Sequence, residues 1–200
     1  MPYEYRKLSI QEQKEIVEER KEQGYPLHSP PHPFREAGIY LITAANYEHK
    51  HIMDSSERRT DFEHLLLKSF QKEKAEIIGW VILLNHYHLL LNVETLEIVS
   101  VLLQHIHGST SFQWNKQDGL TGKRKVWYRF SDRMMRSEKH LQQTLNYIHH
   151  NPVKHGLTED AFEWPWSSLL CYEDEKGKTW IEDNWQKYKP APNFGKGWDD

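Results

Sequence analysis

The sequence predicts an α+β fold in which a small sheet carries helices packed on one face. Runs of β-favouring apolar residues alternate with longer stretches of helical apolar spacing, in the order strand, helix, strand, helix, extended segment, helix. Hydrophobic residues make up 38% of the 200 residues, and eight Trp, ten Tyr and seven Phe add the apolar area that a core needs. The length suits one domain with extensions.

Residues 1–33 are expected to form an arm outside the core. Ser9 to Glu12 has the capping-box pattern and Gly24 stands where a helix stop is expected, which predicts a polar helix over about residues 10–23. The three prolines that follow within four positions favour an extended polyproline segment.

The sheet and its helices are expected within residues 34–172. Strands are predicted over 39–45 and 77–92, helices over 56–73 and 95–116, and a short strand or extended aromatic segment over 126–130. Ser137 is expected to cap a third helix that ends near His150, because Pro152 opposes its simple continuation. Residues 173–200 are acidic and then interrupted by Pro and Gly, so a loosely packed C-terminal tail is predicted.

Composition excludes several classes of protein. Cys171 is the only cysteine, which excludes an intrachain disulfide and a Cys-based zinc site. No signal peptide is recognisable and no apolar run is long enough to span a bilayer, so a cytoplasmic, nucleoid-associated protein without a membrane partner is expected.

The net charge of −3 hides a basic segment with aromatic residues woven into it, between residues 123 and 139. Cations can follow a DNA backbone while exposed rings stack on unpaired bases. The alternative is a solvated loop that runs into a buried aromatic strand. The residues expected to contact DNA are Lys123, Arg124, Lys125, Trp127, Arg129, Arg133, Arg136 and, after the third helix, Lys154.

Two histidines stand two residues apart inside the most apolar run of the chain. Side chains at positions i and i+2 of a strand share a face, so His86 and His88 can converge on one metal ion. The alternative is a pair of hydrogen-bonded histidines on the sheet face. His105 and His107 have the same spacing, but on a helix they point about 200° apart, so no role is assigned to them.

The third helix carries a tyrosine and an asparagine one turn apart. Tyr147 and Asn151 lie together on one flank of its apolar stripe. A tyrosine can attack a phosphodiester when its proton is removed, and a metal neutralises and aligns the phosphate. Two imidazoles and a carboxamide oxygen suit Mg²⁺ or Mn²⁺. The alternatives are an interface aromatic residue and a helix C-cap before proline.

The chain resembles the REP-associated tyrosine transposases of the HUH endonuclease superfamily. The resemblance covers roughly residues 34–172. It is carried by the segments 79–91 (Gly-Trp-Val-Ile-Leu-Leu-Asn-His-Tyr-His-Leu-Leu-Leu), 127–136, 146–157 (Asn-Tyr-Ile-His-His-Asn-Pro-Val-Lys-His-Gly-Leu) and 164–168 (Trp-Pro-Trp-Ser-Ser). The family commonly has proline directly before Asn-His, where this chain has Leu84.

The resemblance implies a ferredoxin-like antiparallel sheet with the two-histidine strand at its centre. It implies that His86, His88 and Asn151 bind the metal and that Tyr147 is the catalytic nucleophile, forming a 5′-phosphotyrosine. It also implies hairpin-bearing single-stranded DNA as substrate and leaves a monomer or a homodimer open.

Two other functions are compared with the sequence pattern. A histidine-triad nucleotide hydrolase needs a third histidine where this chain has Leu90. A domesticated protein that binds DNA hairpins with little or no turnover remains the alternative to the enzyme.

Overall fold

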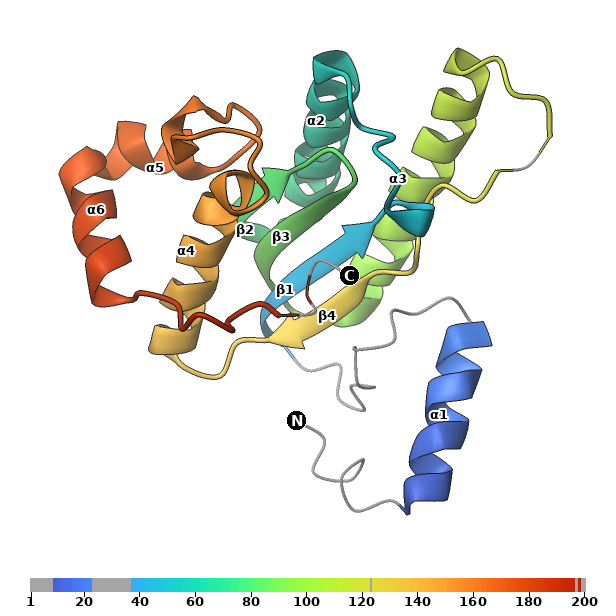
Figure 1. Ribbon diagram of the computed structural model, residues 1–200, viewed down its shortest axis with the longest axis horizontal. Coiled ribbons are helices and arrows are strands. Elements are labelled where there is room, and N and C mark those ends of the chain that lie inside the picture. The colour runs from blue at the N-terminus through green and yellow to red at the C-terminus, as the bar shows by residue number, and fades with distance from the viewer. Residues whose placement is uncertain (1–8, 23–36, 123, 197, 199–200) are drawn as a thin grey trace.

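The computed structural model describes residues 9–22, 37–122, 124–196 and 198 (Figure 1). Its elements are α1 (Ile10–Glu22), β1 (Gly38–Ala45), α2 (Ser56–Lys72), β2 (Glu76–Ile82), β3 (His86–Val93), α3 (Leu96–Gln117), β4 (Ser131–Met134), α4 (Glu138–Lys154), α5 (Leu169–Lys176) and α6 (Lys178–Lys187), with short 3₁₀ turns at Tyr47–His49 and Ala161–Glu163. The predicted α+β class is confirmed. Across these ranges, no helix is long and apolar enough to cross a membrane.

The four strands form one antiparallel sheet in the order β2-β3-β1-β4. With α2 between β1 and β2 and α3 between β3 and β4, this is the expected ferredoxin-like arrangement. β1 and β3 occupy the centre, and their register sets Thr43 opposite His88 and Ala45 opposite His86. The two-histidine strand therefore lies between two neighbours, with its backbone fixed on both sides.

Helices cover both faces of the sheet, whereas the sequence led us to expect one. Side chains alternate along β3, so Tyr87 and Leu89 pack with α2 and α3, and Leu90 packs with Leu145 and Ile148 of α4 (Figure 1). A central strand with apolar residues on both faces needs cover on both, and α4 supplies the second layer. This places α4 against the face that carries His86 and His88.

The apolar run predicted as one strand over 77–92 is two strands joined by a tight turn. The turn closes through a 2.9 Å hydrogen bond from the Leu83 N–H to the His86 carbonyl. Leu83 is buried, so the turn lacks the run of polar residues by which most turns are recognised. The segment 126–130 is extended but forms only a bridge between Trp127 and Asn46, and the edge strand β4 follows it.

The third helix does not end near His150 but continues through Pro152 to Lys154. Pro152 removes a single backbone donor within the last turn, and the His155 N–H closes that turn on the carbonyls of Asn151 and Val153. As a result Tyr147, Asn151 and Lys154 belong to one rigid helix.

The prediction of a loosely packed tail is wrong for α6. Ile181 is buried with Leu169 and Ala161, and the Asn184 carboxamide donates to the Asn146 side chain at 2.9 Å. Figure 1 shows the chain leaving α6, crossing back over α4 and running to the sheet beside β4. The division at residues 33 and 172 stays a prediction.

Candidate active site

β3 presents His86 and His88 side by side to α4. Their ring centroids are 5.2 Å apart, and the His88 ring lies 5.5 Å from the ring of Tyr147. At the end of the same helix the ring of His155 lies 5.0 Å from that of His86. The strand pair and the tyrosine helix, predicted separately, therefore meet at one place.

Neighbouring side chains orient both imidazoles. The Nδ1 atom of His86 lies 2.7 Å from the Asn85 carboxamide oxygen, and the Asn85 amide group donates to the His49 carbonyl at 3.0 Å. Because that oxygen can only accept, the proton of His86 is on Nδ1, and Nε2 is the acceptor nitrogen of the ring. The hydroxyl of Thr43 lies 2.7 Å from Nδ1 of His88. Such partners fix the tautomers of metal-binding histidines.

Asn151 has a buried carboxamide without a hydrogen-bond partner in the part of the chain that is described. It is 0% exposed, and neither its Oδ1 nor its Nδ2 is bonded. A buried unpaired carboxamide is costly. On α4 it lies one turn after Tyr147 and one turn before His155, the two residues that touch His88 and His86. Asn151 thus faces the histidine pair.

The donors present fit a hard divalent cation. Within the described ranges, no three His, Cys, Asp or Glu side chains are grouped to hold a metal. The side chains that would hold one at this place are two imidazoles and one carboxamide. A mixed set of this kind leaves positions for water and phosphate oxygens and suits Mg²⁺ or Mn²⁺.

A cation from the same helix lies against the tyrosine hydroxyl. The ammonium of Lys154 donates a hydrogen bond to the hydroxyl of Tyr147 at 2.9 Å. Lys154 was expected to contact DNA phosphates, and its exposed position leaves it at the surface beside the tyrosine. A cation there stabilises negative charge on the phenol oxygen.

The C-terminal segment covers the tyrosine, which is only 5% exposed. The rings of Phe194 and Trp198 lie 6.0 and 5.0 Å from that of Tyr147. A Cβ at Gly195 would lie 2.3 Å from the tyrosine ring, and the residue has a φ of +76°, so only glycine fits there. This contact joins residues about fifty positions apart, and no local pattern signals it.

The histidines that flank the tyrosine in sequence point elsewhere. Nε2 of His149 lies 3.0 Å from the Ser168 hydroxyl, and burial, with a contribution from His150, lowers its pKa to about 3. The His150 ring packs 4.0 Å from the ring of Trp185. Neither histidine is placed to take the proton of Tyr147.

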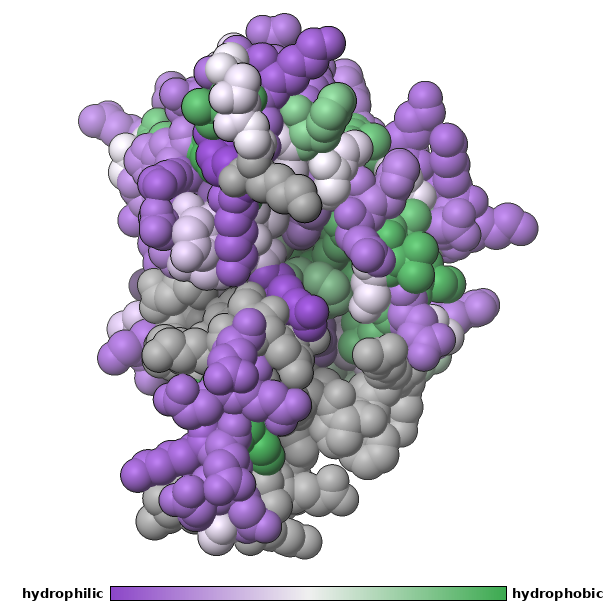
Figure 2. Space-filling model, turned by 90° about the vertical axis from the view of Figure 1, so that its right-hand side faces the viewer, coloured by the Kyte–Doolittle hydropathy of each residue, from purple (hydrophilic) through white to green (hydrophobic). Residues whose placement is uncertain are grey.

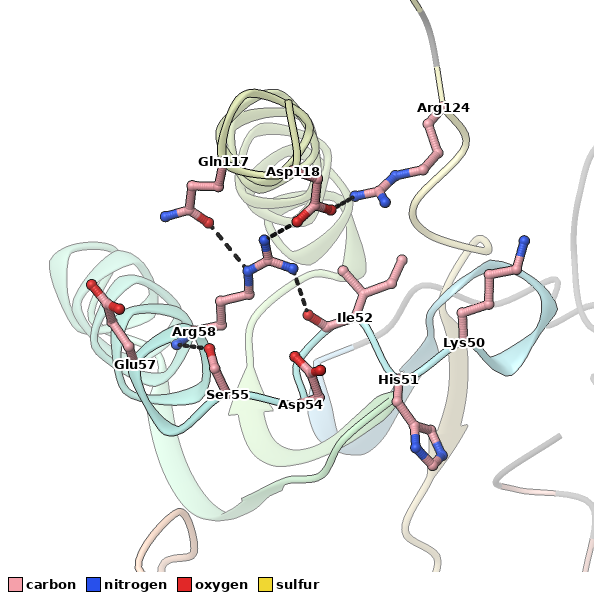
Figure 3. A pocket seen from close by; sticks show the side chains of 10 residues that line it. All are labelled: Lys50, His51, Ile52, Asp54, Ser55, Glu57, Arg58, Gln117, Asp118 and Arg124. Atoms are coloured by element: carbon pink, nitrogen blue, oxygen red, sulfur yellow. Dashed lines mark hydrogen bonds and ion pairs between the residues drawn. The ribbon is translucent and has the colours of Figure 1, made fainter. Parts of the chain in front are cut away.

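The basic residues predicted to contact DNA lie in different surroundings. Lys125, Arg129 and Arg136 are exposed, and Lys123 lies outside the described residues. Arg124 forms an ion pair with Asp118 at 2.8 Å (Figure 3). Burial raises the pKa of Asp118, but hydrogen bonds from Arg58 and Arg124 outweigh it and keep the pKa below the usual value.

Trp127 and Arg133, two further members of that set, pack against aromatic rings. Trp127 is only 7% exposed and stacks between Phe62 and His107, so for this ring the alternative of a buried aromatic segment is confirmed and the expected open stacking ring is not. The guanidinium of Arg133 lies 4.7 Å from the ring centroid of Trp198, on the active-site face of the sheet. Arg133 therefore contacts the C-terminal segment that covers Tyr147.

Comparison with known proteins finds relatives of one kind. No protein-family model matches the chain. A protein of Haemophilus influenzae named as a REP-associated tyrosine transposase is 26% identical over 161 residues, which are 75% of this chain and 89% of that protein. The REP-associated tyrosine transposase of Escherichia coli K12 is 28% identical over 113 residues, 53% of this chain and 61% of that protein. The chain is therefore similar to REP-associated tyrosine transposases over about three quarters of its length.

A solved structure of a REP-associated tyrosine transposase bound to a REP hairpin has the same fold. The TM-score is 0.59 at 22% identity, over 74% of this chain and 87% of the other. The departure from the family pattern at Leu84 leaves the turn between β2 and β3 ordered, because its carbonyl accepts the Met53 N–H at 2.9 Å.

Proposed function

We propose that this chain is a REP-associated tyrosine transposase, like the relatives it resembles, and that it cuts and rejoins single-stranded DNA with Tyr147 as the nucleophile. The observation that carries the proposal is the meeting of Tyr147 with the histidine pair of β3, at ring distances of 5.5 Å to His88 and 5.2 Å between the histidines. A tyrosine, two oriented imidazoles and a buried unpaired carboxamide are the side chains that metal-assisted phosphoryl transfer requires.

The reaction makes one bond and breaks one. The phenol oxygen of Tyr147 attacks the scissile phosphorus, and the bond between that phosphorus and the 3′-oxygen breaks. The phenol loses a proton and the 3′-oxygen gains one. Lys154, 2.9 Å from the phenol oxygen, stabilises the negative charge that develops there. The 5′-phosphotyrosine keeps the energy of the broken bond, so a 3′-hydroxyl can reverse the step and join strands without ATP.

His86, His88 and Asn151 would hold the Mg²⁺ or Mn²⁺ ion. When bound, the ion supplies charge neutralisation and alignment of the scissile phosphate. The chain itself presets the site, since Asn85 and Thr43 orient the two imidazoles before any ligand arrives.

The substrate we propose is single-stranded DNA that carries a hairpin of the REP type. The related solved transposase is bound to a REP hairpin. In this chain the exposed cations Lys125, Arg129 and Arg136 precede and follow β4 in the sequence, and exposed cations can neutralise phosphates.

The decisive experiment looks for the covalent intermediate. The protein is incubated with hairpin-bearing single-stranded oligonucleotides and Mn²⁺ or Mg²⁺, and the products are separated under denaturing conditions. We expect a protein–DNA adduct that is lost in Tyr147→Phe and in the presence of EDTA. An adduct of equal yield in Tyr147→Phe would show that another residue is the nucleophile.

The cover over Tyr147 favours a second candidate, a hairpin-binding protein with little turnover. Phe194, Gly195 and Trp198 lie against the side chain of Tyr147, which a scissile phosphate would have to reach. Tight binding of hairpin DNA without any adduct, for the full chain and for a chain that ends at Tyr188, would establish this alternative.

A further inference from the structure

A second cavity, of about 700 Å³, lies on the face of the sheet opposite the active site, between α3 and the segment 124–130. Tyr87, which stands between His86 and His88, points to that face, and its hydroxyl lies 3.0 Å from Nε2 of His107 on the cavity wall. The strand that presents the two candidate metal ligands on one side thus supports this wall on the other. The proposed phosphoryl transfer does not use the cavity.

His107 is held as a neutral hydrogen-bond donor. Burial lowers its pKa to about 3, so the ring is neutral at ordinary pH. Because the buried Tyr87 hydroxyl needs an acceptor, it donates to Nε2, and the proton of His107 is on Nδ1. Trp127 stacks on the ring at 4.4 Å and fixes it.

The lining combines cations with neutral polar and aromatic groups and contains no carboxylate. It consists of Ser100, Leu103, Gln104, His107, Gly108, Ser111 and residues 124–130. Lys125 and Arg129 are exposed, and Lys125 lies 4.6 Å from the ring centroid of Tyr47. The neighbouring cavity, of about 590 Å³, is lined by three acidic side chains, Asp54, Glu57 and Asp118, and by three cations, of which Arg58 and Arg124 are paired with Asp118 (Figure 3).

An exposed aromatic residue stands next to the cavity. Phe112, one helical turn after Gly108, is 74% exposed, which is unusual for so large an apolar side chain. Figure 2 faces this side of the molecule and shows a patch of apolar atoms within a mostly hydrophilic surface. An exposed ring beside a cation-lined cavity is the pairing with which proteins bind unpaired bases.

We propose that this cavity binds one unpaired nucleotide of the DNA, a deepening of the proposed function on which it rests. The base enters between α3 and the aromatic segment and accepts a hydrogen bond from Nδ1 of His107, and its phosphate lies against Lys125 and Arg129. The volume is within the usual range for a small-molecule site, about 300–1,000 Å³. The cavity therefore binds a base outside the hairpin stem, at a distance from the scissile phosphate.

Gly108 offers a way to fill the cavity without disturbing the fold. A Cβ built there meets no atom within 4 Å, so the Cβ of Gly108→Phe has room, and its ring is added to a residue that lines the cavity. Gln113→Phe is the matched control, because Gln113 is exposed on the same helix but does not line the cavity. Both variants are compared with the full-length wild-type chain in binding to a hairpin oligonucleotide with unpaired flanks.

The oligonucleotide carries one abasic position at a time along its unpaired flanks. We expect one position at which loss of the base weakens wild-type binding about tenfold, as for one stacked base. Gly108→Phe should bind the intact oligonucleotide about tenfold more weakly and be insensitive to that position, whereas Gln113→Phe should behave as wild type. Unchanged binding and unchanged position dependence in Gly108→Phe would overturn the proposal.

The adduct at Tyr147 separates this proposal from the proposed function. An adduct in both proteins with no loss of affinity in Gly108→Phe would overturn the cavity and leave the function. Position-dependent binding that Gly108→Phe abolishes, without an adduct in either protein, would support the cavity as a nucleotide site and remove the enzyme. Absence of any binding by the wild type would overturn both.

Discussion

The chain contains two His-x-His pairs of identical spacing that lie in different secondary structure and have different surroundings. His86 and His88 lie on one face of β3, 5.2 Å apart and both buried against the tyrosine helix. His105 and His107 lie on α3, where the first is exposed and the second is bonded to Tyr87 and stacked on Trp127. Spacing alone carries no function; the period of the element decides whether two imidazoles can share a ligand.

The largest expected effect, on the rate of adduct formation, tests whether His86 and His88 belong to the reactive centre and the histidines of α3 do not. His88→Ala should lower the rate of adduct formation at least about a thousandfold, since it removes a proposed metal ligand. His105→Ala is the control of equal chemistry and should react at the wild-type rate. The rate is measured by denaturing gel, with thermal melting to show that both variants are folded. Equal losses in the two variants would break the distinction between the pairs.

The next effect concerns the cation beside the nucleophile. Lys154→Ala should slow adduct formation about a hundredfold, the size expected when a donor to a developing negative charge is lost. Lys154→Arg should retain most of the rate because it keeps the charge. Hairpin affinity is measured in parallel, and a loss confined to affinity would assign Lys154 to DNA binding alone.

The third prediction concerns His107 on α3, whose burial should make the free energy of unfolding depend on pH. His107 binds a proton near pH 6.5 when unfolded but only near pH 3 when folded, so its contribution is complete above pH 6.5 and is lost as the pH falls towards 3. At pH 5 the wild type should have lost about 2 kcal/mol relative to pH 8 through this group.

Urea unfolding of His107→Gln at the two pH values measures that loss. The variant should show a pH dependence smaller by about 2 kcal/mol, while the exposed control His105→Gln should match the wild type. An identical pH dependence in all three proteins would mean that His107 is not held neutral by its surroundings.

The smallest effect concerns the cover over the tyrosine. Trp198→Ala removes a ring 5.0 Å from that of Tyr147 and should raise the adduct rate a few-fold by opening the site. Trp180→Ala is the control, because Trp180 is a half-exposed tryptophan on α6 that stacks on Tyr172 instead. A slower reaction in Trp198→Ala would show that the segment supports the tyrosine rather than covering it.

The comparison of the two pairs also shows what sequence could predict. Strand and helix periodicity placed His86 with His88, and helical spacing placed Tyr147 with Asn151, because both are local rules. Local rules failed where burial overrides them, at the apolar turn of Leu83 and at Pro152 inside α4.

Contacts between distant segments could not be predicted from any pattern. Strand register brings Thr43 opposite His88, 45 positions away, so that Thr43 orients its imidazole, and Gly195 passes over Tyr147, almost fifty residues earlier. The packing of α4 against β3 was also missed. The sequence led us to expect helices on one face of the sheet, whereas β3 carries apolar residues on both faces and α4 covers the second.

The most direct test of the account is the binding of Mn²⁺ to the DNA-free protein, followed by electron paramagnetic resonance. We expect one ion per chain in the wild type and in His105→Ala, and binding weakened at least about a hundredfold in His88→Ala and in Asn151→Ala. Wild-type Mn²⁺ affinity in His88→Ala would contradict the claim that the strand pair, with Asn151, forms the metal centre beside Tyr147.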